Sequence, residues 1–341
     1  METHRPTLIS VVLPSFNECE GLPVVLSSVS QVLARTGFSY EILVIDDGST
    51  DATRQYMVDA CAKQPHLRYV RLSRNFGKEA ALSAGLKASV GDAVILMDAD
   101  GQHPASLIPV FLDRWRQGYE VVAAVQKSRS ESWPKRRFKG WYYRLLEAGS
   151  SVVIPPDAGD FRLLDRKVVD AINALPERNR LMKGLYAWVG FRTDFIPFEA
   201  EARVAGQTKF TWGQLFRLAF TGLTSFTVVP LRLVSFAGVI ISVSSMFYGL
   251  YLLFEHVVEG DHLPGWATLS VGMMFLSGVQ LLALGVIGEY LGRTFEEAKQ
   301  RPVYIVAEDS RVKAKTHAKA PVYDATALVT EARFPDTPTI S

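Results

Sequence analysis

Two long apolar segments near the carboxyl end place the strongest constraint on how this chain can fold. Residues 233–254 carry no charged side chain over about 22 positions, and a membrane-spanning helix needs roughly 20 apolar residues. Residues 267–287 form a second uncharged run, rich in Leu, Met, Val and Gly. Because a buried helix of a soluble protein rarely stays apolar on every side for so long, we expect two transmembrane helices, at 232–257 and 266–291.

The charges beside these segments predict their orientation. A short acidic connection separates the two runs, whereas Arg217 and Arg232 precede the first, and Arg293, Lys299 and Arg301 follow the second. Since Lys and Arg accumulate on the cytoplasmic side of a membrane, we expect a multi-pass protein of the inner (plasma) membrane. Its large domain and both termini would then lie in the cytoplasm.

The remaining boundaries follow from composition. Residues 1–207 are expected to form the cytoplasmic domain, and the amphipathic residues 208–231 to lie as a helix along the membrane surface. Residues 292–341 are expected to be a cytoplasmic tail that is disordered after about 308, where the sequence becomes polar. At the end of the second apolar helix, Glu289 is placed to pair with Arg293.

The first two-thirds of the chain alternates short apolar runs with helical patterns. Apolar runs of about four to eight residues that end at turn signals are typical of buried strands. Their alternation with helices through short connections predicts an α/β domain, a mainly parallel sheet with helices on both faces. Asn17 and Glu20 are expected to cap the first helix. The predicted strands are 8–13, 41–45, 67–72, 94–97 and 119–125.

Polar and acidic side chains follow three of these strands. Ligands of such sheets bind beyond the carboxyl ends of the strands, whereas acidic turns without a function would be scattered over both edges. The convergence of these side chains therefore favours a site for a metal and a nucleotide at this edge. The residues concerned are Asn17, Glu18, Asp46, Asp47, Asp98 and Asp100.

The turn Asp98–Gln102 is the candidate metal site. The carboxylates of Asp98 and Asp100, with Gln102 after a glycine, are hard oxygen ligands of the kind that suits Mg²⁺ or Mn²⁺. Taken alone, the turn is equally compatible with a plain solvated acidic turn. A calcium-binding loop is disfavoured, because its last ligand position needs a glutamate and Pro109 stands there.

Two further classes of protein are disfavoured. A dinucleotide-dependent dehydrogenase would need a G-x-G-x-x-G loop after a strand, and none is present. The net charge of +2 gives no indication of nucleic acid as a partner. Residues 126–144, in contrast, are locally basic and interleaved with aromatic side chains. This mixture is typical of a helix on an anionic membrane surface, with an ordinary solvated charge run as the alternative, and Arg136 and Arg137 are candidate contacts.

Together the motifs resemble those of the family 2 inverting glycosyltransferases of GT-A fold. Within that family they are similar to enzymes that act on polyisoprenyl phosphates: bactoprenol glucosyltransferases, undecaprenyl-phosphate aminoarabinose transferases and dolichol-phosphate mannose synthases. The resemblance covers roughly residues 7–305, with Thr208 where Ser is commoner and Phe16 where many members carry Tyr. The matching motifs are VVLPSFNE (11–18), IDDGSTD (45–51), LSRNFGKEAALSAG (72–85), MDADGQHP (97–104), GDFRLLDR (159–166), RVAGQTKF (203–210) and GEYLGRTFEEAKQRPVY (288–304).

The resemblance implies a GT-A (Rossmann-like), mainly parallel sheet domain followed by two transmembrane helices, and it divides the site residues into sets. The residues expected to contact the nucleotide are Pro14, Phe16, Glu18, Asp46 and Asp47. Those expected to hold Mg²⁺ or Mn²⁺ and the donor diphosphate are Asp98, Ala99, Asp100 and Gln102. The catalytic set is Asp100, Asp160, which would face the acceptor, and Arg203 and Lys209, which would bind phosphate.

The implied activity is the transfer of one hexose from a nucleotide sugar, UDP-glucose being the first choice, to undecaprenyl (polyprenyl) phosphate with inversion. GDP-mannose and UDP-N-acetylglucosamine are alternative donors, and a non-catalytic membrane scaffold that binds a nucleotide sugar is the alternative of another class. Processive polysaccharide synthases carry Q-x-x-R-W, and the nearest run here, Gln214–Leu218, lacks the tryptophan. The expected partners are the donor, the lipid acceptor and the bilayer, without nucleic acid; a homo-oligomer is left open.

Overall fold

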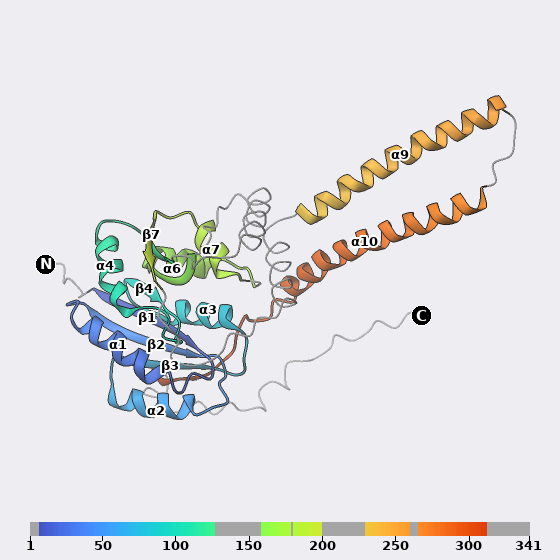
Figure 1. Cartoon of the computed structure of the whole chain (residues 1–341). Helices are drawn as coiled ribbons and strands as arrows, with labels where there is room; N and C mark the ends of the chain where they lie inside the picture. The colour runs from blue at the N-terminus through green and yellow to red at the C-terminus, as the bar shows by residue number, and fades with distance from the viewer. Residues whose placement is uncertain (1–6, 127–157, 179, 200–228, 260–264, 312–341) are drawn as a thin grey trace, which may run out of the picture.

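An eight-stranded sheet is the centre of the computed structural model, which describes residues 7–126, 158–178, 180–199, 229–259 and 265–311 (Figure 1). The strand order is β7-β5-β6-β4-β1-β2-β3-β8. The five strands predicted from the sequence are present within a few residues of their expected ends. The strands are β1 (Leu8–Ser15), β2 (Ser39–Asp46), β3 (Leu67–Leu72), β4 (Ala93–Leu96), β5 (Val121–Gln126), β6 (Ala158–Asp165), β7 (Thr193–Phe198) and β8 (Val306–Asp309).

The central strands are parallel, as predicted: β1 pairs with β2 and with β4, and β2 pairs with β3. The strand β6 was not predicted, and it lies antiparallel between β4 and β5. Its register places Arg162 opposite Leu96, so that Asp160 falls beside the carboxyl end of β4. The antiparallel strand therefore brings Asp160 to Asp98 across a distance of 62 residues in the sequence.

Helices cover both faces of the sheet, because its strands are apolar on both sides. Neighbouring residues of β1 show the alternation: Val11 packs in the core under one helical layer and Val12 in the core under the other, and both are fully buried. The first layer holds α1 (Leu22–Ala34), α2 (Thr53–Lys63) and α4 (Ile108–Arg116), the last entered through a 3₁₀ turn at Ala105–Leu107. The second layer holds α3 (Lys78–Ala88), α6 (Arg166–Ala174) and α7 (Met182–Trp188).

The predicted cap of α1 by Asn17 and Glu20 is wrong. The helix begins after Gly21, without a side-chain hydrogen bond at its cap. Asn17 instead adopts a left-handed backbone conformation, with φ of 55°, and its side-chain oxygen accepts a hydrogen bond from the Thr50 N–H at 2.9 Å. Asn17 therefore ties the loop after β1 to the loop after β2, two segments that form one edge of the site.

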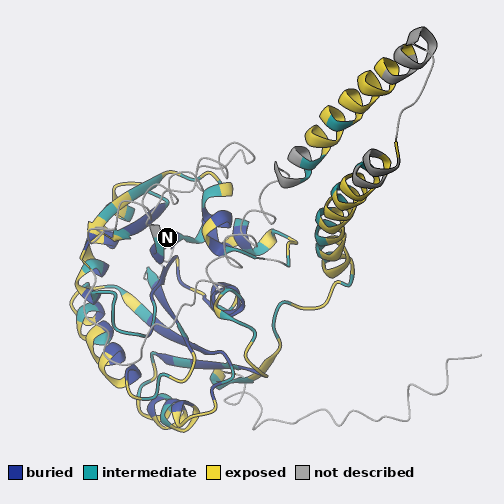
Figure 2. Ribbon diagram, turned by 45° about the vertical axis from the view of Figure 1, so that its right-hand side comes forward, coloured by how far each residue is buried: buried dark blue, intermediate teal, exposed yellow. Residues whose placement is uncertain are grey.

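Two long helices follow the sheet domain, α9 (Val229–Glu259) and α10 (Trp266–Ala298). By length and composition each could cross a membrane, over Val234–Tyr251 and Gly272–Ala298. Neither window is buried inside the protein, which distinguishes both from the core helices of the sheet domain (Figure 2). The predicted ion pair between Glu289 and Arg293 is confirmed, with 3.0 Å between oxygen and nitrogen.

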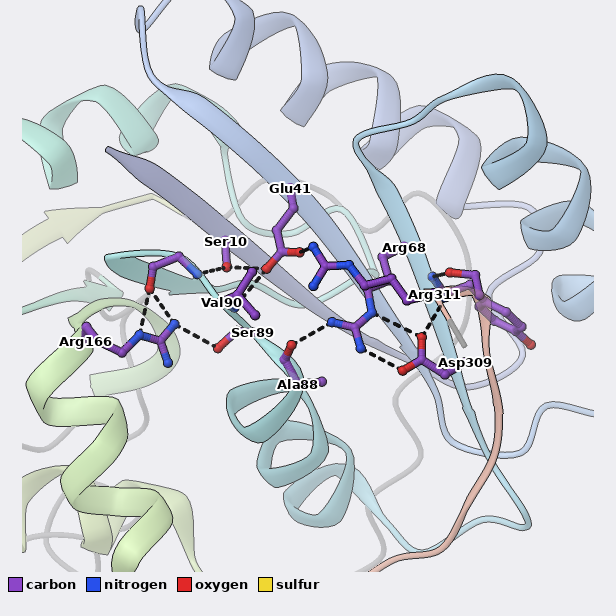
Figure 3. A network of polar contacts seen from close by, with 12 residues as sticks. Ser10, Glu41, Arg68, Ala88, Ser89, Val90, Arg166, Asp309 and Arg311 are labelled. Atoms are coloured by element: carbon purple, nitrogen blue, oxygen red, sulfur yellow. Dashed lines mark hydrogen bonds and ion pairs between the residues drawn. The ribbon is translucent and has the colours of Figure 1, made fainter. Parts of the chain in front are cut away.

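The strand β8 returns from the end of α10 and pairs antiparallel with β3; it ends at Asp309, close to residue 308, after which the sequence analysis expected disorder. Arg68 forms an ion pair with Asp309 at 2.6 Å, and Arg311 forms one with the buried Glu41 at 3.0 Å (Figure 3). Glu41 also accepts a hydrogen bond from the hydroxyl of Ser10 in β1. These contacts fasten the chain that leaves α10 to the edge of the sheet.

Candidate active site

The loop after β2 forms the first part of the site through Asp47. The carboxylate of Asp47 accepts hydrogen bonds from the backbone N–H groups of Phe76, at 2.7 Å, and Gly77, at 2.8 Å. Burial raises the pKa of Asp47, although these two N–H groups oppose the shift. Gly48 allows the close approach, because a Cβ there would lie 2.4 Å from the backbone of Arg74. Asp47 thus fixes the loop after β3 against the loop after β2.

Asp46 lies at the carboxyl end of β2, as predicted, and its side chain has partners within the protein. Its side chain is fully buried and accepts hydrogen bonds from the Ser49 N–H at 2.7 Å and the Tyr69 hydroxyl at 2.5 Å. Arg71 adds an ion pair at 3.4 Å. A carboxylate with these internal partners builds the loop that carries Asp47; its predicted contact with the substrate stays a prediction.

The end of β1 supplies the other residues predicted to contact a nucleotide. Pro14 and Glu18 are partly buried, whereas the ring of Phe16 is 43% exposed. The Asp47 N–H donates to the carbonyl of Ser15 at 2.9 Å, which joins the ends of β1 and β2. Phe16 therefore presents an aromatic surface to solvent directly beside the Asp47 loop.

The turn after β4 contains the predicted metal ligands. Asp98, Asp100 and Gln102 are partly exposed, whereas Ala99 is buried at 2% exposure. Asp100 accepts a hydrogen bond from the Gln102 N–H at 3.0 Å, and His103 accepts one from the Asp98 N–H at 3.0 Å. The backbone of the turn is thus held by its own side chains, while Ala99 packs inward and the carboxylate of Asp98 lies on the outer side.

A cation that the sequence analysis did not select joins this turn to β6. The ammonium of Lys78, the first residue of α3, lies 2.7 Å from Asp98 Oδ1 and 2.8 Å from Asp160 Oδ2. Burial opposes the charge of Lys78, but the carboxylates of Asp98 and Asp160 outweigh it and raise the pKa of the ammonium. A sequence signal was available, because a lysine in the first turn of a helix faces the positive end of the helix dipole and needs an anionic partner.

Asp160 is held from behind by buried groups of the second helical layer. It is 8% exposed, and Arg162, two residues along β6, is 5% exposed with its guanidinium 3.8 Å from the centre of the Tyr186 ring. Burial raises the pKa of Asp160, but Lys78, with smaller contributions from Lys183 and Arg162, outweighs this effect, so that the pKa lies below its usual value. Asp160 is therefore a negatively charged group at a mostly buried position.

Glu79, the neighbour of Lys78 in α3, is a partly buried carboxyl group that the sequence analysis missed. Its carboxylate accepts a hydrogen bond from the Met182 N–H at 2.9 Å. Burial raises the pKa of Glu79 to about 7, with a smaller contribution of the same sign from Asp160. Glu79 thus fixes α7 to the first turn of α3. In the part of the chain that the structure describes, it forms no hydrogen bond or ion pair with Asp98.

The residues of the turn fit a divalent metal ion that shares its coordination with a ligand. Among the described residues, no group of three or more His, Cys, Asp and Glu side chains is arranged to hold a metal ion. Asp98 and Asp100 nevertheless offer carboxylate oxygens and Gln102 an amide oxygen, the donor types that Mg²⁺ and Mn²⁺ prefer when they keep positions for phosphate oxygens. Asp160 Oδ1 is buried without a hydrogen-bond partner in the described part of the chain, so one acceptor is unused.

A cavity of about 990 Å³ adjoins the site on the side of α10. Arg74 and Phe76, from the loop that binds Asp47, line it on one side, and Gly292 and Arg293 of α10 line it on the other. The Ser73 N–H donates to the carbonyl of Ile305 at 2.9 Å, which holds this loop to the segment after α10. The loop after β3 therefore contacts the carboxylate edge on one side and the end of the apolar helix on the other.

Four predicted site residues lie outside the described part of the chain: Arg136, Arg137, Arg203 and Lys209. The structure brings together the other predicted residues at the carboxyl edge of the sheet, and it adds Lys78, Glu79, Arg162 and His103 to them. An open, mainly parallel sheet with carboxylates at its carboxyl edge and without a glycine-rich phosphate loop is the GT-A arrangement of glycosyltransferases.

Comparison with known proteins assigns the family. A model described as glycosyl transferase family 2 matches residues 10–172. An uncharacterized glycosyltransferase of Synechocystis is 45% identical over 88% of this chain and 95% of its own length. The prophage bactoprenol glucosyl transferase homolog of Escherichia coli K12 is 39% identical over 87% of this chain and 98% of its own. The chain belongs to the family 2 glycosyltransferases.

Two further similarities complete the comparison. The bactoprenol glucosyl transferase of Shigella phage SfV is 40% identical over 89% of this chain and 99% of its own length. The crystal structure of the glucosyl-3-phosphoglycerate synthase of Mycobacterium tuberculosis with Mn²⁺, UDP-glucose and phosphoglyceric acid has a TM-score of 0.43 and 20% identity. That similarity covers 64% of this chain and 78% of the other.

Proposed function

We propose that this glycosyltransferase transfers a hexose from a nucleotide sugar to polyprenyl phosphate, with UDP-glucose as the first candidate donor, at the cytoplasmic face of the inner membrane. The observation that carries the proposal is the double contact of the loop after β3. Phe76 donates to Asp47 on the donor side and lines the cavity against α10 on the other. A lipid phosphate at the membrane end of α10 would thus be one loop away from the donor carboxylates. The names of the bactoprenol relatives, which match nearly the whole chain, also support this acceptor.

On the donor side, Asp98, Asp100 and Gln102 would hold Mg²⁺ or Mn²⁺. When bound, such an ion would neutralise the negative charge that grows on the leaving diphosphate. The nucleotide would lie against the ends of β1 and β2, where Phe16 is exposed and Asp47 fixes the neighbouring loop.

On the acceptor side, the nucleophile would be an oxygen of the lipid phosphate. The second pKa of a phosphate monoester is about 6, so the group is largely ionised at neutral pH and needs no strong general base. Asp160 would accordingly orient the reacting groups, because its low pKa makes it a fixed negative charge. Direct attack on the anomeric carbon implies inversion.

Arg203 and Lys209 are proposed to hold the anionic acceptor, Arg through a planar fork and Lys as a point charge. Arg136 and Arg137 would add weaker attraction to the membrane surface, about 1 kcal/mol for each cation. Residues 208–231 would lie along that surface as an amphipathic helix, and α9 and α10 would cross the membrane.

The test is a donor panel with undecaprenyl phosphate and detergent-solubilised protein. UDP-glucose, UDP-N-acetylglucosamine and GDP-mannose are compared with and without chelator, and the glycolipid is analysed by mass spectrometry. We expect glycolipid from UDP-glucose only when a divalent metal is present. Arg203→Ala should lose glycolipid formation while it retains donor binding in calorimetry. If glycolipid forms only from another donor, UDP-glucose is the wrong donor. If the donor is hydrolysed and no glycolipid forms, polyprenyl phosphate is the wrong acceptor.

The orientation is tested by cysteine labelling from outside the cell. A probe cysteine in the connection 260–264 should react, whereas one at Lys299 should not, because the positive flank would be cytoplasmic. Of the two native cysteines, Cys19 is replaced by Ser, and Cys61 reacts slowly because burial raises the pKa of its thiol to about 11. The reverse labelling pattern would place the sheet domain on the wrong side for a cytoplasmic nucleotide sugar.

A further inference from the structure

One ammonium group links the two carboxylates of the site that come from different strands. Lys78 Nζ lies 2.7 Å from Asp98 Oδ1, 2.8 Å from Asp98 Oδ2 and 2.8 Å from Asp160 Oδ2. Both oxygens of the carboxylate on the metal turn are therefore in contact with a cation of the protein itself. A divalent ion at Asp98 would compete with this ammonium for the same two oxygens.

The place of Lys78 in the chain makes its position specific. It is the first residue of α3, where the helix dipole disfavours a cation, so the pairing with Asp98 and Asp160 is what compensates the charge. The two preceding backbone N–H groups, of Phe76 and Gly77, are bound to Asp47. Lys78 therefore directly follows the two residues that bind Asp47, in the part of the site that would receive the nucleotide.

Lys78 is also the most exposed of the three groups. Its side chain is 43% exposed, whereas that of Asp160 is 9% exposed and that of Asp98 is 26% exposed. Lysine is a flexible side chain that acts as a point charge, so its ammonium can leave one anion for another without a change in the backbone. An arriving diphosphate is such an anion.

We propose that Lys78 is an internal counter-cation that occupies Asp98 while the donor is absent, so that the divalent metal enters together with the nucleotide sugar and not before it. This inference rests on the proposed metal and donor site. Lys78 acts here as a positioning residue: it holds Asp98 next to Asp160 and competes with free metal for Asp98. When the metal and the diphosphate arrive together, they supply a cation for Asp98 and an anion for Lys78 in one step.

The experiment is a titration of the full-length protein with Mn²⁺ alone, followed by electron paramagnetic resonance, and then a second titration in the presence of UDP. Wild-type protein should bind Mn²⁺ weakly alone and more tightly with UDP. In Lys78→Met, binding of Mn²⁺ alone should become about tenfold tighter, the effect of removing one close opposite charge from a carboxylate. The additional tightening by UDP should shrink correspondingly.

Three variants control the result. Lys78→Arg keeps the charge and should resemble wild type, Lys78→Gln should resemble Lys78→Met, and Lys87→Met changes an exposed lysine at the other end of α3 and should have no effect. A merely structural role of Lys78 would weaken the binding of Mn²⁺ in Lys78→Met instead of tightening it.

Two outcomes separate this inference from the proposed function. If Mn²⁺ binding depends on Asp98, as judged by Asp98→Asn, but Lys78→Met and Lys78→Gln leave it unchanged or weaker, the competition is overturned while the metal site remains. If Asp98→Asn has no effect on Mn²⁺ binding, the proposed metal site is overturned and the inference with it.

Discussion

The carboxyl edge of the sheet has two halves that satisfy their carboxylates in different ways. Beside β2, Asp46 and Asp47 are buried and bound by N–H groups of the backbone, a tyrosine hydroxyl and Arg71. Beside β4 and β6, Asp98 and Asp160 both form ion pairs with the ammonium of Lys78. In the first half the carboxylates are thus satisfied by hydrogen bonds that hold the loops of the fold together. In the second half they are satisfied by a lysine side chain, which a metal ion could replace.

This difference matches the chemistry proposed for each half. A nucleotide needs a preformed surface, and backbone hydrogen bonds provide one because breaking them would leave buried donors unsatisfied. A metal that shares its ligands with the donor phosphates needs carboxylates that can be released from another cation. Substitutions in the first half should therefore affect stability and donor binding together, whereas those in the second should affect catalysis with little change in stability.

The largest effect is expected at the metal turn. Asp98→Asn and Asp100→Asn should each reduce transfer at least about a thousandfold, because the loss of metal binding removes several kcal/mol of charge stabilisation in the transition state. The thermal midpoint should change little, since Lys78 keeps Asp160 as a partner in Asp98→Asn. Transfer is measured with radiolabelled donor and the midpoint by calorimetry. Wild-type rates in either variant, or full activity in chelator, would contradict the role of the metal.

Asp47→Ala should show the opposite combination. It leaves the N–H groups of Phe76 and Gly77 without their acceptor, a cost of about 1–3 kcal/mol, so the thermal midpoint should fall. Donor affinity should weaken by roughly tenfold to a hundredfold, because the loop beside the nucleotide loses its anchor. Asp59→Asn, an exposed carboxylate of α2, is the matched control. If Asp47→Ala lowers activity with an unchanged midpoint, the distinction between the two halves fails.

A third prediction concerns pH and Glu79, on the metal side of the edge. Its pKa is raised from 4.5 to about 7, with Asp160, Lys78 and Lys183 as the charged groups around it. The folded state therefore binds more protons than the unfolded state between these values, so its contribution to stability falls as pH rises from about 4.5 to about 7. Above about pH 7 the cost of holding a charged Glu79 in the folded protein no longer changes with pH.

Glu79→Gln should remove this dependence. At about pH 8 the variant should be more stable than wild type by on the order of 2 kcal/mol. Well below about pH 4.5 the difference should vanish, because the carboxyl group is then protonated in both the folded and the unfolded protein. Thermal unfolding at the two pH values measures the difference, with the exposed Glu177→Gln as a control. Equal differences at both pH values would show that the hydrogen bond to Met182, and not the charge, determines the effect.

The sequence was sufficient for the elements whose signals are local. The strands β1 to β5 end at turn residues, and their carboxylates could be placed at one edge because parallel strands end together. The Glu289–Arg293 pair followed from helical spacing.

What the sequence did not predict depends on partners far along the chain. β8 exists because β3 offers an edge and Arg68 a partner for Asp309, a contact between residues 241 positions apart. Lys78 finds Asp160 only because β6 runs antiparallel beside β4. Similarly, two consecutive aspartates at a strand end do not reveal which one points inward, since side chains alternate between the faces. Both are buried, but Asp46 binds Ser49 and Tyr69, whereas Asp47 binds the loop after β3.

The smallest effect is expected at Phe16, on the nucleotide side. Phe16 is 43% exposed beside the Asp47 loop. Phe16→Tyr adds one hydroxyl group without a change in burial, and one new hydrogen bond to the donor contributes about 0.5–1.5 kcal/mol. Donor affinity in calorimetry should therefore rise between twofold and about tenfold, with the thermal midpoint unchanged. Phe195→Tyr, at an equally exposed ring on β7, should have no effect on donor affinity. An unchanged affinity in Phe16→Tyr would place the nucleotide away from this ring and restrict the preformed surface to the Asp47 loop.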